Sequence, residues 1–158
     1  MENLNIALIG CGMIGREHIE RIQNRIRGAK IVAVCDVFEE GAKKGAEIAG
    51  AGTKVYTDFN EAINDPDVNA VVVTTPGQFH KGPVLAAIKA GKPVFCEKPL
   101  ATTLEDAKKV VEAEKASGKR LVQVGFMRRF DPDYIKMKKI LDSGELGAPL
   151  MAHCISRT

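Results

Sequence analysis

A glycine pattern near the N-terminus constrains the fold of this chain more than any other feature. An apolar run over residues 4–9 ends in Gly10-x-Gly12-x-x-Gly15, and a helical pattern opens directly after it. In a strand–turn–helix unit, Gly10 permits a tight turn, Gly12 lets a pyrophosphate approach the backbone, and Gly15 lets the helix pack close to the sheet. The free N–H groups at the start of such a helix favour bound phosphate. The pattern therefore predicts a dinucleotide site.

An acidic residue follows at the spacing that such a site requires. Asp36 closes the apolar run 30–35, and it lies 21 residues after Gly15. At this distance a carboxylate can accept hydrogen bonds from the adenosine ribose, and it repels a 2′-phosphate. Residues 37–40 contain no cation, so we predict NAD rather than NADP as the cofactor. The alternative interpretation is an Asp that serves only as a turn or cap residue at a strand end.

Composition excludes several classes of protein. The net charge is only +3, aromatic residues make up 5% and Trp is absent, so a nucleic-acid partner is not expected. No apolar stretch approaches the roughly 20 residues that span a bilayer, and the N-terminus does not resemble a signal peptide. We therefore predict a cytoplasmic protein without a membrane partner. The four cysteines lack CxxC spacing, which predicts free buried thiols and no metal site.

Strand-like and helical patterns alternate along the chain. The strands expected after the first cover residues 30–35, 54–56, 70–74, 93–96 and 121–124. Such alternation predicts an α/β fold, a Rossmann-type doubly wound parallel sheet with right-handed crossovers, over residues 1–125. We expect residues 126–158 to form a connecting helix and then, from Pro149, the first strand of a second α+β domain that is truncated here.

In such a sheet, the loops that precede helices lie at one carboxyl edge. The turn 74–77, the triplet Glu97-Lys98-Pro99 and residues 125–129 should therefore converge on the glycine loop. Lys98 follows a buried-looking strand, and a lysine in a partly desolvated site can transfer a proton or polarise a hydroxyl. The Lys98–Pro99 peptide bond is a candidate for the cis form. The alternative for Lys98 is a solvated loop lysine.

Five further side chains have open assignments. Arg128 or its neighbour Arg129 could bind a hydroxyl-rich substrate, or be a surface charge. His80 could contact the nicotinamide end of a cofactor, or cap or pack a helix. His153 could contact substrate, or pack on the sheet from the expected terminal strand. His18 falls on the apolar face of the first helix, where a packed, hydrogen-bonded histidine is favoured over a catalytic one.

Together these motifs resemble the Gfo/Idh/MocA oxidoreductase family. The resemblance is carried by the glycine pattern, Asp36, the Thr74-Thr75-Pro76 turn with His80, the Glu-Lys-Pro triplet and the run 125–131. It covers essentially the whole chain, as that family's N-terminal Rossmann domain, and the run 124–131 is most similar to the inositol dehydrogenase branch. The resemblance implies NAD(P)-dependent oxidation of a sugar or polyol hydroxyl to a ketone.

The resemblance also implies roles for individual residues. The lysine matching Lys98 contacts the reacting hydroxyl, and the arginine matching Arg128 lines the substrate pocket. The partners of the lysine, an Asp and a His of the second domain, lie beyond Thr158, so the chain alone should be inactive. At Ser156 and Thr158 the sequence departs from the inositol branch, so a related inositol isomer or sugar stays open as substrate. Family members associate through the second domain, which implies a homo-oligomer for a longer protein.

The predicted site combines these arguments. The predicted catalytic residue is Lys98, and the predicted substrate-binding residues are Lys98, Arg128 and His153. The predicted cofactor-binding residues are Gly10, Gly12, Met13, Ile14, Gly15, Asp36, Val37, Thr74, Thr75, Pro76, His80, Glu97 and Lys98. One alternative function is a non-enzymatic NAD-binding, redox-sensing module, which has no need of the lysine. Another is a methyltransferase-like fold, against which the three glycines and the Glu-Lys-Pro triplet argue.

Overall fold

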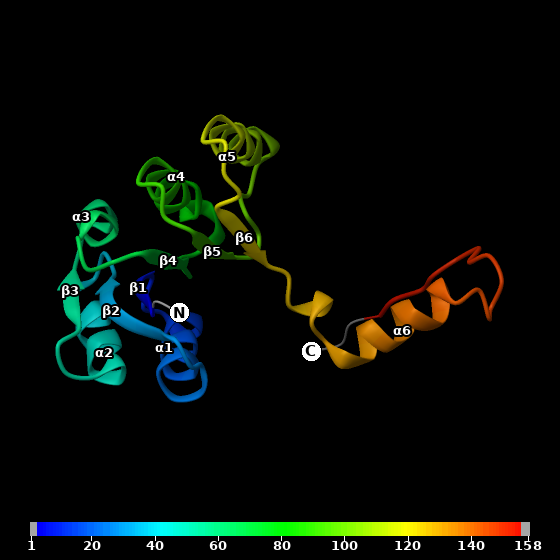
Figure 1. Cartoon of the computed structure of the whole chain (residues 1–158), viewed down its shortest axis with the longest axis horizontal. Coiled ribbons are helices and arrows are strands. Elements are labelled where there is room, and N and C mark those ends of the chain that lie inside the picture. Colours follow the sequence, from blue (N-terminus) through cyan, green and yellow to red (C-terminus); the bar gives the residue numbers. More distant parts are fainter. Residues whose placement is uncertain (1–2, 156–158) are drawn as a thin grey trace. The chain divides into compact units, whose positions relative to one another are not determined.

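The first part of the chain is built on one parallel sheet. The computed structural model describes residues 3–155, and the chain divides into two compact units, Met1–Gly125 and Phe126–Thr158. In the first unit, six parallel strands follow the order β3-β2-β1-β4-β5-β6. Helices α1 and α2 cover one face of this sheet, and α3, α4 and α5 cover the other (Figure 1). The predicted Rossmann-type doubly wound sheet is confirmed.

The helices and strands alternate throughout the first unit. Its elements are β1 Leu4–Ile9, α1 Met13–Arg25, β2 Ala29–Cys35, α2 Glu39–Ala49, β3 Lys54–Tyr56, α3 Phe59–Asn64, β4 Ala70–Val73, the 3-10 helix η1 Gly77–Phe79, α4 Lys81–Lys89, β5 Val94–Glu97, α5 Leu104–Ala116 and β6 Val122–Gly125. The elements of the second unit are the 3-10 helix η2 Met127–Arg129 and α6 Pro132–Asp142.

The central strand β1 is buried on both faces, because helices cover both sides of the sheet. Ile6 and Leu8 belong to one apolar cluster, and Ala7 and Ile9 belong to the other. On one side β1 pairs with β2, and on the other it pairs with β4, where Ile6 lies opposite Ala70. Such double burial explains the continuous apolar run that predicted this strand.

Three helices begin at a side-chain cap. The side chains of Asp58, Thr103 and Asp131 each accept a hydrogen bond from a backbone N–H in the first turn, at 2.7, 3.2 and 3.1 Å. They begin α3, α5 and α6 respectively. A side chain of this kind satisfies one of the N–H groups that an α-helix leaves unpaired at its start.

α4 begins only at Lys81, because i→i+3 hydrogen bonds first form η1, with the Phe79 N–H donating to the Pro76 carbonyl at 2.8 Å. The strand expected from Pro149 is absent over residues 149–155, where the chain has no regular structure. A strand needs a neighbouring strand that pairs with its backbone groups, and the described residues of the second unit contain no such strand. Ser156 and Thr158 lie outside the described residues. The second unit's identity as the start of a substrate domain stays a prediction.

The cysteines are free, as expected, but one of them is not buried. Burial raises the pKa of the Cys11, Cys35 and Cys96 thiols to about 12, so these groups stay protonated and inert. Cys154 is exposed, because it lies in the irregular segment of the second unit. In the described part of the chain, no helix is both long and apolar enough to cross a membrane.

A polar cluster that the sequence did not predict joins β3 to the turn after α3. Asp65 is only 5% exposed, and its carboxylate accepts hydrogen bonds from Lys54 Nζ at 2.7 Å and from the Tyr56 hydroxyl. The Asp67 N–H donates to the same carboxylate at 2.8 Å. The hydrogen bond from Lys54, followed by that from Tyr56, lowers the pKa of Asp65 to about 2. The sequence suggested only a turn at this point.

Replacing Asp65 by alanine is expected to lower the free energy of unfolding by about 2 kcal/mol at neutral pH, because the Lys54 ammonium group and the half-buried Tyr56 hydroxyl lose their buried, charged acceptor. The folded pKa lies below the unfolded value of 3.8, so this stabilisation is present above pH 3.8 and lost as pH falls toward about 2. Urea denaturation at pH 7 and pH 2 measures both effects. Asp67→Ala, which removes the exposed partner of Lys54, is the control and should cost much less. An equal loss in the two variants would contradict the assignment.

Candidate active site at the carboxyl edge of the sheet

The glycine loop after β1 is held by close backbone contacts. Gly10 has a φ of +99°, and a Cβ there would lie 2.6 Å from the Thr75 nitrogen. A Cβ on Gly15 would lie 2.0 Å from the Gly10 carbonyl oxygen, so the helix cannot approach with a side chain at this position. A Cβ on Gly12 would meet nothing within 4 Å. The first and third glycines are thus required by packing, and the second leaves open space.

That open space lies at the start of α1. The helix begins after Gly12 without a side-chain cap, and its first turn contains no acidic residue. Met13 and Ile14 are exposed. An uncapped helix start carries free N–H groups and a partial positive charge, which suit a phosphate. The loop therefore fits the pyrophosphate of a dinucleotide.

Asp36 ties the end of β2 to the glycine loop. Its Oδ2 accepts a hydrogen bond from the Cys11 N–H at 2.8 Å, and its Oδ1 accepts one from the Phe38 N–H at 3.0 Å. The side chain is half-buried, and each carboxylate oxygen can accept a further hydrogen bond. Val37 is 80% exposed beside it. The acid therefore fits a ribose, and no hydrogen bond or ion pair of its side chain involves a cation among the described residues.

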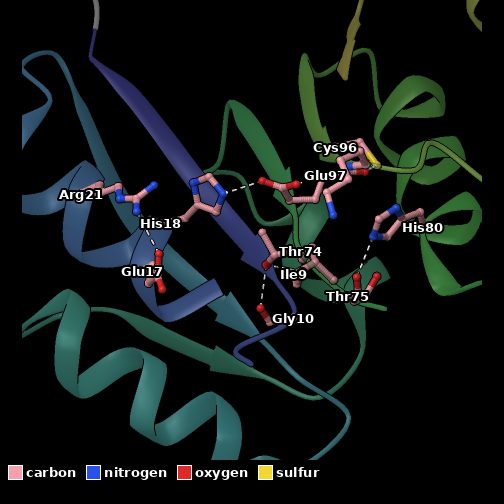
Figure 2. Close-up of polar contacts among 11 residues, drawn as sticks. Ile9, Gly10, Glu17, His18, Arg21, Thr74, Thr75, His80, Cys96 and Glu97 are labelled. Carbon is pink, nitrogen blue, oxygen red and sulfur yellow. Dashed lines mark hydrogen bonds and ion pairs between the residues drawn. The ribbon is translucent and has the colours of Figure 1, made fainter. Parts of the chain in front are cut away.

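The turn after β4 supports the glycine loop from the other side. The buried Thr74 hydroxyl donates to the Gly10 carbonyl oxygen at 2.7 Å (Figure 2). The backbone N–H of Thr74 donates to the Ile9 carbonyl oxygen at 2.8 Å. The Thr75 hydroxyl is buried and has no hydrogen-bond partner among the described residues. Pro76 is exposed. Thr74 thus acts on the loop, and its direct contact with a cofactor stays a prediction.

The Glu-Lys-Pro triplet follows β5 at the same edge. Glu97 Oε1 lies 3.0 Å from Nε2 of His18, which reaches it from α1 (Figure 2). The Lys98 N–H donates to Glu97 Oε2 at 3.2 Å, and the peptide bond to Pro99 is cis, as the sequence suggested. Lys98 itself is exposed, whereas partial desolvation was expected. Its side chain is therefore free to meet a ligand.

His80 is enclosed by the backbone around it. Its ring is fully buried, with Nδ1 lying 2.6 Å from the Pro99 carbonyl oxygen and Nε2 lying 2.6 Å from the Thr75 carbonyl oxygen. Because both ring nitrogens face backbone oxygens, the packing interpretation is favoured over direct cofactor contact. The structural interpretation of His18 is confirmed, because its ring bonds Glu97 and packs edge-on against Phe95.

The family assignment comes from a sequence match that includes the residues of this site. Residues 4–126 match the family model described as "Oxidoreductase family, NAD-binding Rossmann fold". The chain belongs to the Gfo/Idh/MocA oxidoreductase family. The match contains the glycine loop, Asp36, the turn after β4 and the Glu-Lys-Pro triplet, and it confirms the family resemblance of the sequence.

Several relatives within the Gfo/Idh/MocA family are named as inositol dehydrogenases. An inositol 2-dehydrogenase of Azotobacter vinelandii is 54% identical over 154 residues, which are 98% of this chain and 46% of that protein. The structure of a Lactobacillus casei myo-inositol dehydrogenase in complex with NAD(H) and myo-inositol has a TM-score of 0.90 and 43% identity, covering 94% of this chain and 44% of that one. A scyllo-inositol dehydrogenase of Lactobacillus casei with NAD(H) and scyllo-inositol has a TM-score of 0.85 and 30% identity, over 92% and 43%. The chain thus spans just under half the length of these relatives.

The substrate residues predicted in the second unit are described by themselves. Arg128 pairs with Asp131 at 2.9 Å, and its guanidinium lies 5.2 Å from the centre of the Tyr134 ring. Arg129 lies in η2, and His153 is exposed. Whether either arginine or His153 binds substrate stays a prediction, as does the oligomeric state of a longer family member.

Sequence reasoning missed two contacts that join separate loops of the site. The Cys11 N–H reaches Asp36, and His18 reaches Glu97. The first contact uses a backbone group, which leaves no trace in the sequence. A signal for the second was present, because His18 lies on the same apolar face of α1 that packs on the sheet. Only its partner, which lies 79 residues away, could not be found.

Proposed function

We propose that this chain is the NAD-binding half of a dehydrogenase that oxidises one hydroxyl of an inositol or a related polyol to a ketone. The observation that supports this most directly is the convergence of three groups at one edge of the sheet. The glycine loop, Asp36 and Lys98 follow β1, β2 and β5. Hydrogen bonds link Asp36 and the turn after β4 to the glycine loop, and they link Glu97, the neighbour of Lys98, to α1.

In this proposal some residues of the chain bind the cofactor, and Lys98 takes part in proton transfer. The loop 10–15 and the start of α1 would hold the pyrophosphate, and Asp36 would accept hydrogen bonds from the adenosine ribose. NAD, when bound, supplies the hydride acceptor. As the substrate C–H bond gives its hydride to the cofactor, the hydroxyl loses its proton and becomes a carbonyl. Lys98 would hydrogen-bond that hydroxyl and receive or relay the proton.

The preference for NAD over NADP rests on the surroundings of Asp36. A carboxylate beside the ribose repels a 2′-phosphate. The next two residues, Val37 and Phe38, are apolar and exposed, and the first cation of α2, Lys43, is paired with Glu39 at 3.1 Å. Residues 37–42 contain no cation that would compensate the phosphate charge.

The substrate class rests on the relatives. The Azotobacter vinelandii protein is named an inositol 2-dehydrogenase, and the two Lactobacillus casei structures contain myo-inositol and scyllo-inositol. Because relatives of this chain bind different isomers, the proposal extends to inositols and related polyols and does not choose a stereoisomer.

Titration of the purified chain with NADH and NADPH, followed by nicotinamide fluorescence, tests the cofactor half of the proposal. We expect saturable NADH binding that is tighter than NADPH binding. We also expect no inositol-dependent NADH formation by these 158 residues alone, because the chain covers only 46% of its dehydrogenase relative. Absence of binding to either nucleotide would contradict the proposed site. NADH formation with inositol would show that the chain needs no second domain.

A further inference from the structure

The residues on both sides of Lys98 are each held by a histidine ring. Before it, Glu97 Oε1 lies 3.0 Å from His18 Nε2, and after it, the Pro99 carbonyl oxygen lies 2.6 Å from His80 Nδ1. The ammonium group of Lys98 makes no hydrogen bond or ion pair within residues 3–155. The backbone that carries Lys98 is therefore fixed, while its amine stays free.

His80 joins this loop to β4. Its ring is fully buried, and Nε2 lies 2.6 Å from the Thr75 carbonyl oxygen while Nδ1 contacts Pro99. One imidazole thus bridges the turn after β4 and the loop after β5, two segments at the carboxyl edge of the sheet. Figure 2 shows the ring beside Thr75.

His18 joins the same loop to the helix that follows the glycine loop. Its side chain is 20% exposed and that of Glu97 is 19% exposed, so solvent screens this pair only partly. The ring also packs edge-on against Phe95, with centroids 5.7 Å apart. A displacement of the Glu97 backbone would therefore break contacts to α1, whose first turn faces the predicted pyrophosphate.

We propose that His18 and His80 are positioning residues that fix where Lys98 stands relative to a bound nicotinamide. This inference rests on the proposed function, because it presupposes NAD at the glycine loop. Both ring nitrogens of His80 are engaged by backbone carbonyl oxygens and Nε2 of His18 is engaged by Glu97, so both rings act through the backbone on either side of Lys98. A shift of about 1 Å in a reacting group is enough to lower its effectiveness strongly.

Trace acetylation of the chain, with and without saturating NADH, tests this inference. Mass spectrometry reports the labelling of each lysine separately. We expect NADH to lower the labelling of Lys98 several-fold in the natural chain. In His18→Leu and His80→Leu, NADH should bind with a nearly unchanged Kd, measured by nicotinamide fluorescence, but protect Lys98 little. His18→Gln keeps an N–H donor toward Glu97 and should restore protection, which a merely structural role would not predict.

The controls separate the possible failures. Arg21→Leu removes the neighbouring pair with Glu17 on the same helix (Figure 2), and it should leave Lys98 protection unchanged. His80→Leu leaves two carbonyls unpaired and can prevent folding, so His18→Leu, at a partly exposed pair, decides the test. Equal protection of Lys98 in the natural chain and in folded His18→Leu would overturn the inference while the proposed function stands. Absence of NADH binding by the natural chain would overturn both.

Discussion

Replacing Gly15 by alanine is expected to abolish NADH binding and to lower the free energy of unfolding by about 3 kcal/mol, the upper end of the usual cost of overpacking. A Cβ at this position would lie 2.0 Å from the Gly10 carbonyl oxygen, so helix and loop would have to separate. Replacing Gly12 by alanine should leave stability almost unchanged, because its Cβ would meet nothing within 4 Å. It should still weaken NADH binding by on the order of a hundredfold, because the methyl group occupies the approach of the pyrophosphate.

The two glycine variants form a matched pair, since both add one methyl group to the same loop. Urea denaturation measures stability, and nicotinamide fluorescence measures binding. Alanine at Gly91, where a φ of +68° adds strain but no ligand is expected, is the control for a glycine substitution away from the site. The assignment of the loop to pyrophosphate would be wrong if Gly12→Ala bound NADH as tightly as the natural chain.

Replacing Asp36 by alanine is expected to raise the Kd for NADH about thirtyfold, which corresponds to about 2 kcal/mol for hydrogen bonds to a charged acceptor. The Kd for NADPH should fall or stay unchanged, because the repulsion of the 2′-phosphate is removed. The ratio of the two constants, measured in one titration series, therefore decides the role of this residue better than either constant alone.

Asp67→Ala controls for the loss of one negative charge. Asp67 precedes β4, so it lies at the amino edge of the sheet, opposite the carboxyl edge that carries the candidate site. Its side chain is exposed beside Lys54. It should leave both constants unchanged. If Asp36→Ala altered NADH and NADPH binding in the same proportion, Asp36 would be a turn residue that supports the loop through the Cys11 N–H, and not a ribose ligand.

The parts of the fold that follow from local chemistry were predictable from the sequence. Doubly buried strands such as β4 read as continuous apolar runs, and short polar side chains such as Thr103 mark helix starts. The glycine loop and Asp36 were predictable because their spacing reflects one turn and one crossover. The position of Lys98 at the carboxyl edge of the sheet was predictable only because parallel strands bring their following loops to one edge.

The remaining features depend on contacts between distant residues. The partners of His80 are carbonyl oxygens, which every residue carries, so the sequence gives no sign of them. Asp65 accepts hydrogen bonds from Lys54 and Tyr56, which lie 11 and 9 residues earlier in the chain, whereas the residues around Asp65 suggest only a turn. The missing strand after Pro149 shows the opposite case, because a strand-like pattern has no effect without a neighbour to pair with.

The place of β1 at the centre of the sheet has a consequence for the order of folding. Pairing of β1 with β2 closes a short crossover, but pairing of β1 with β4 joins Ile6 to Ala70 across more than sixty residues. Contacts that are so distant in sequence form slowly, because the entropy of loop closure is lost before the contact is gained. Thr74 and Thr75, in the turn after β4, support the glycine loop. A partly folded chain without the pairing of β1 with β4 therefore has the glycine pattern in its sequence but not the geometry of the folded loop. Binding of NADH should therefore report the completed sheet, and the nucleotide should slow unfolding without accelerating the earliest steps of folding.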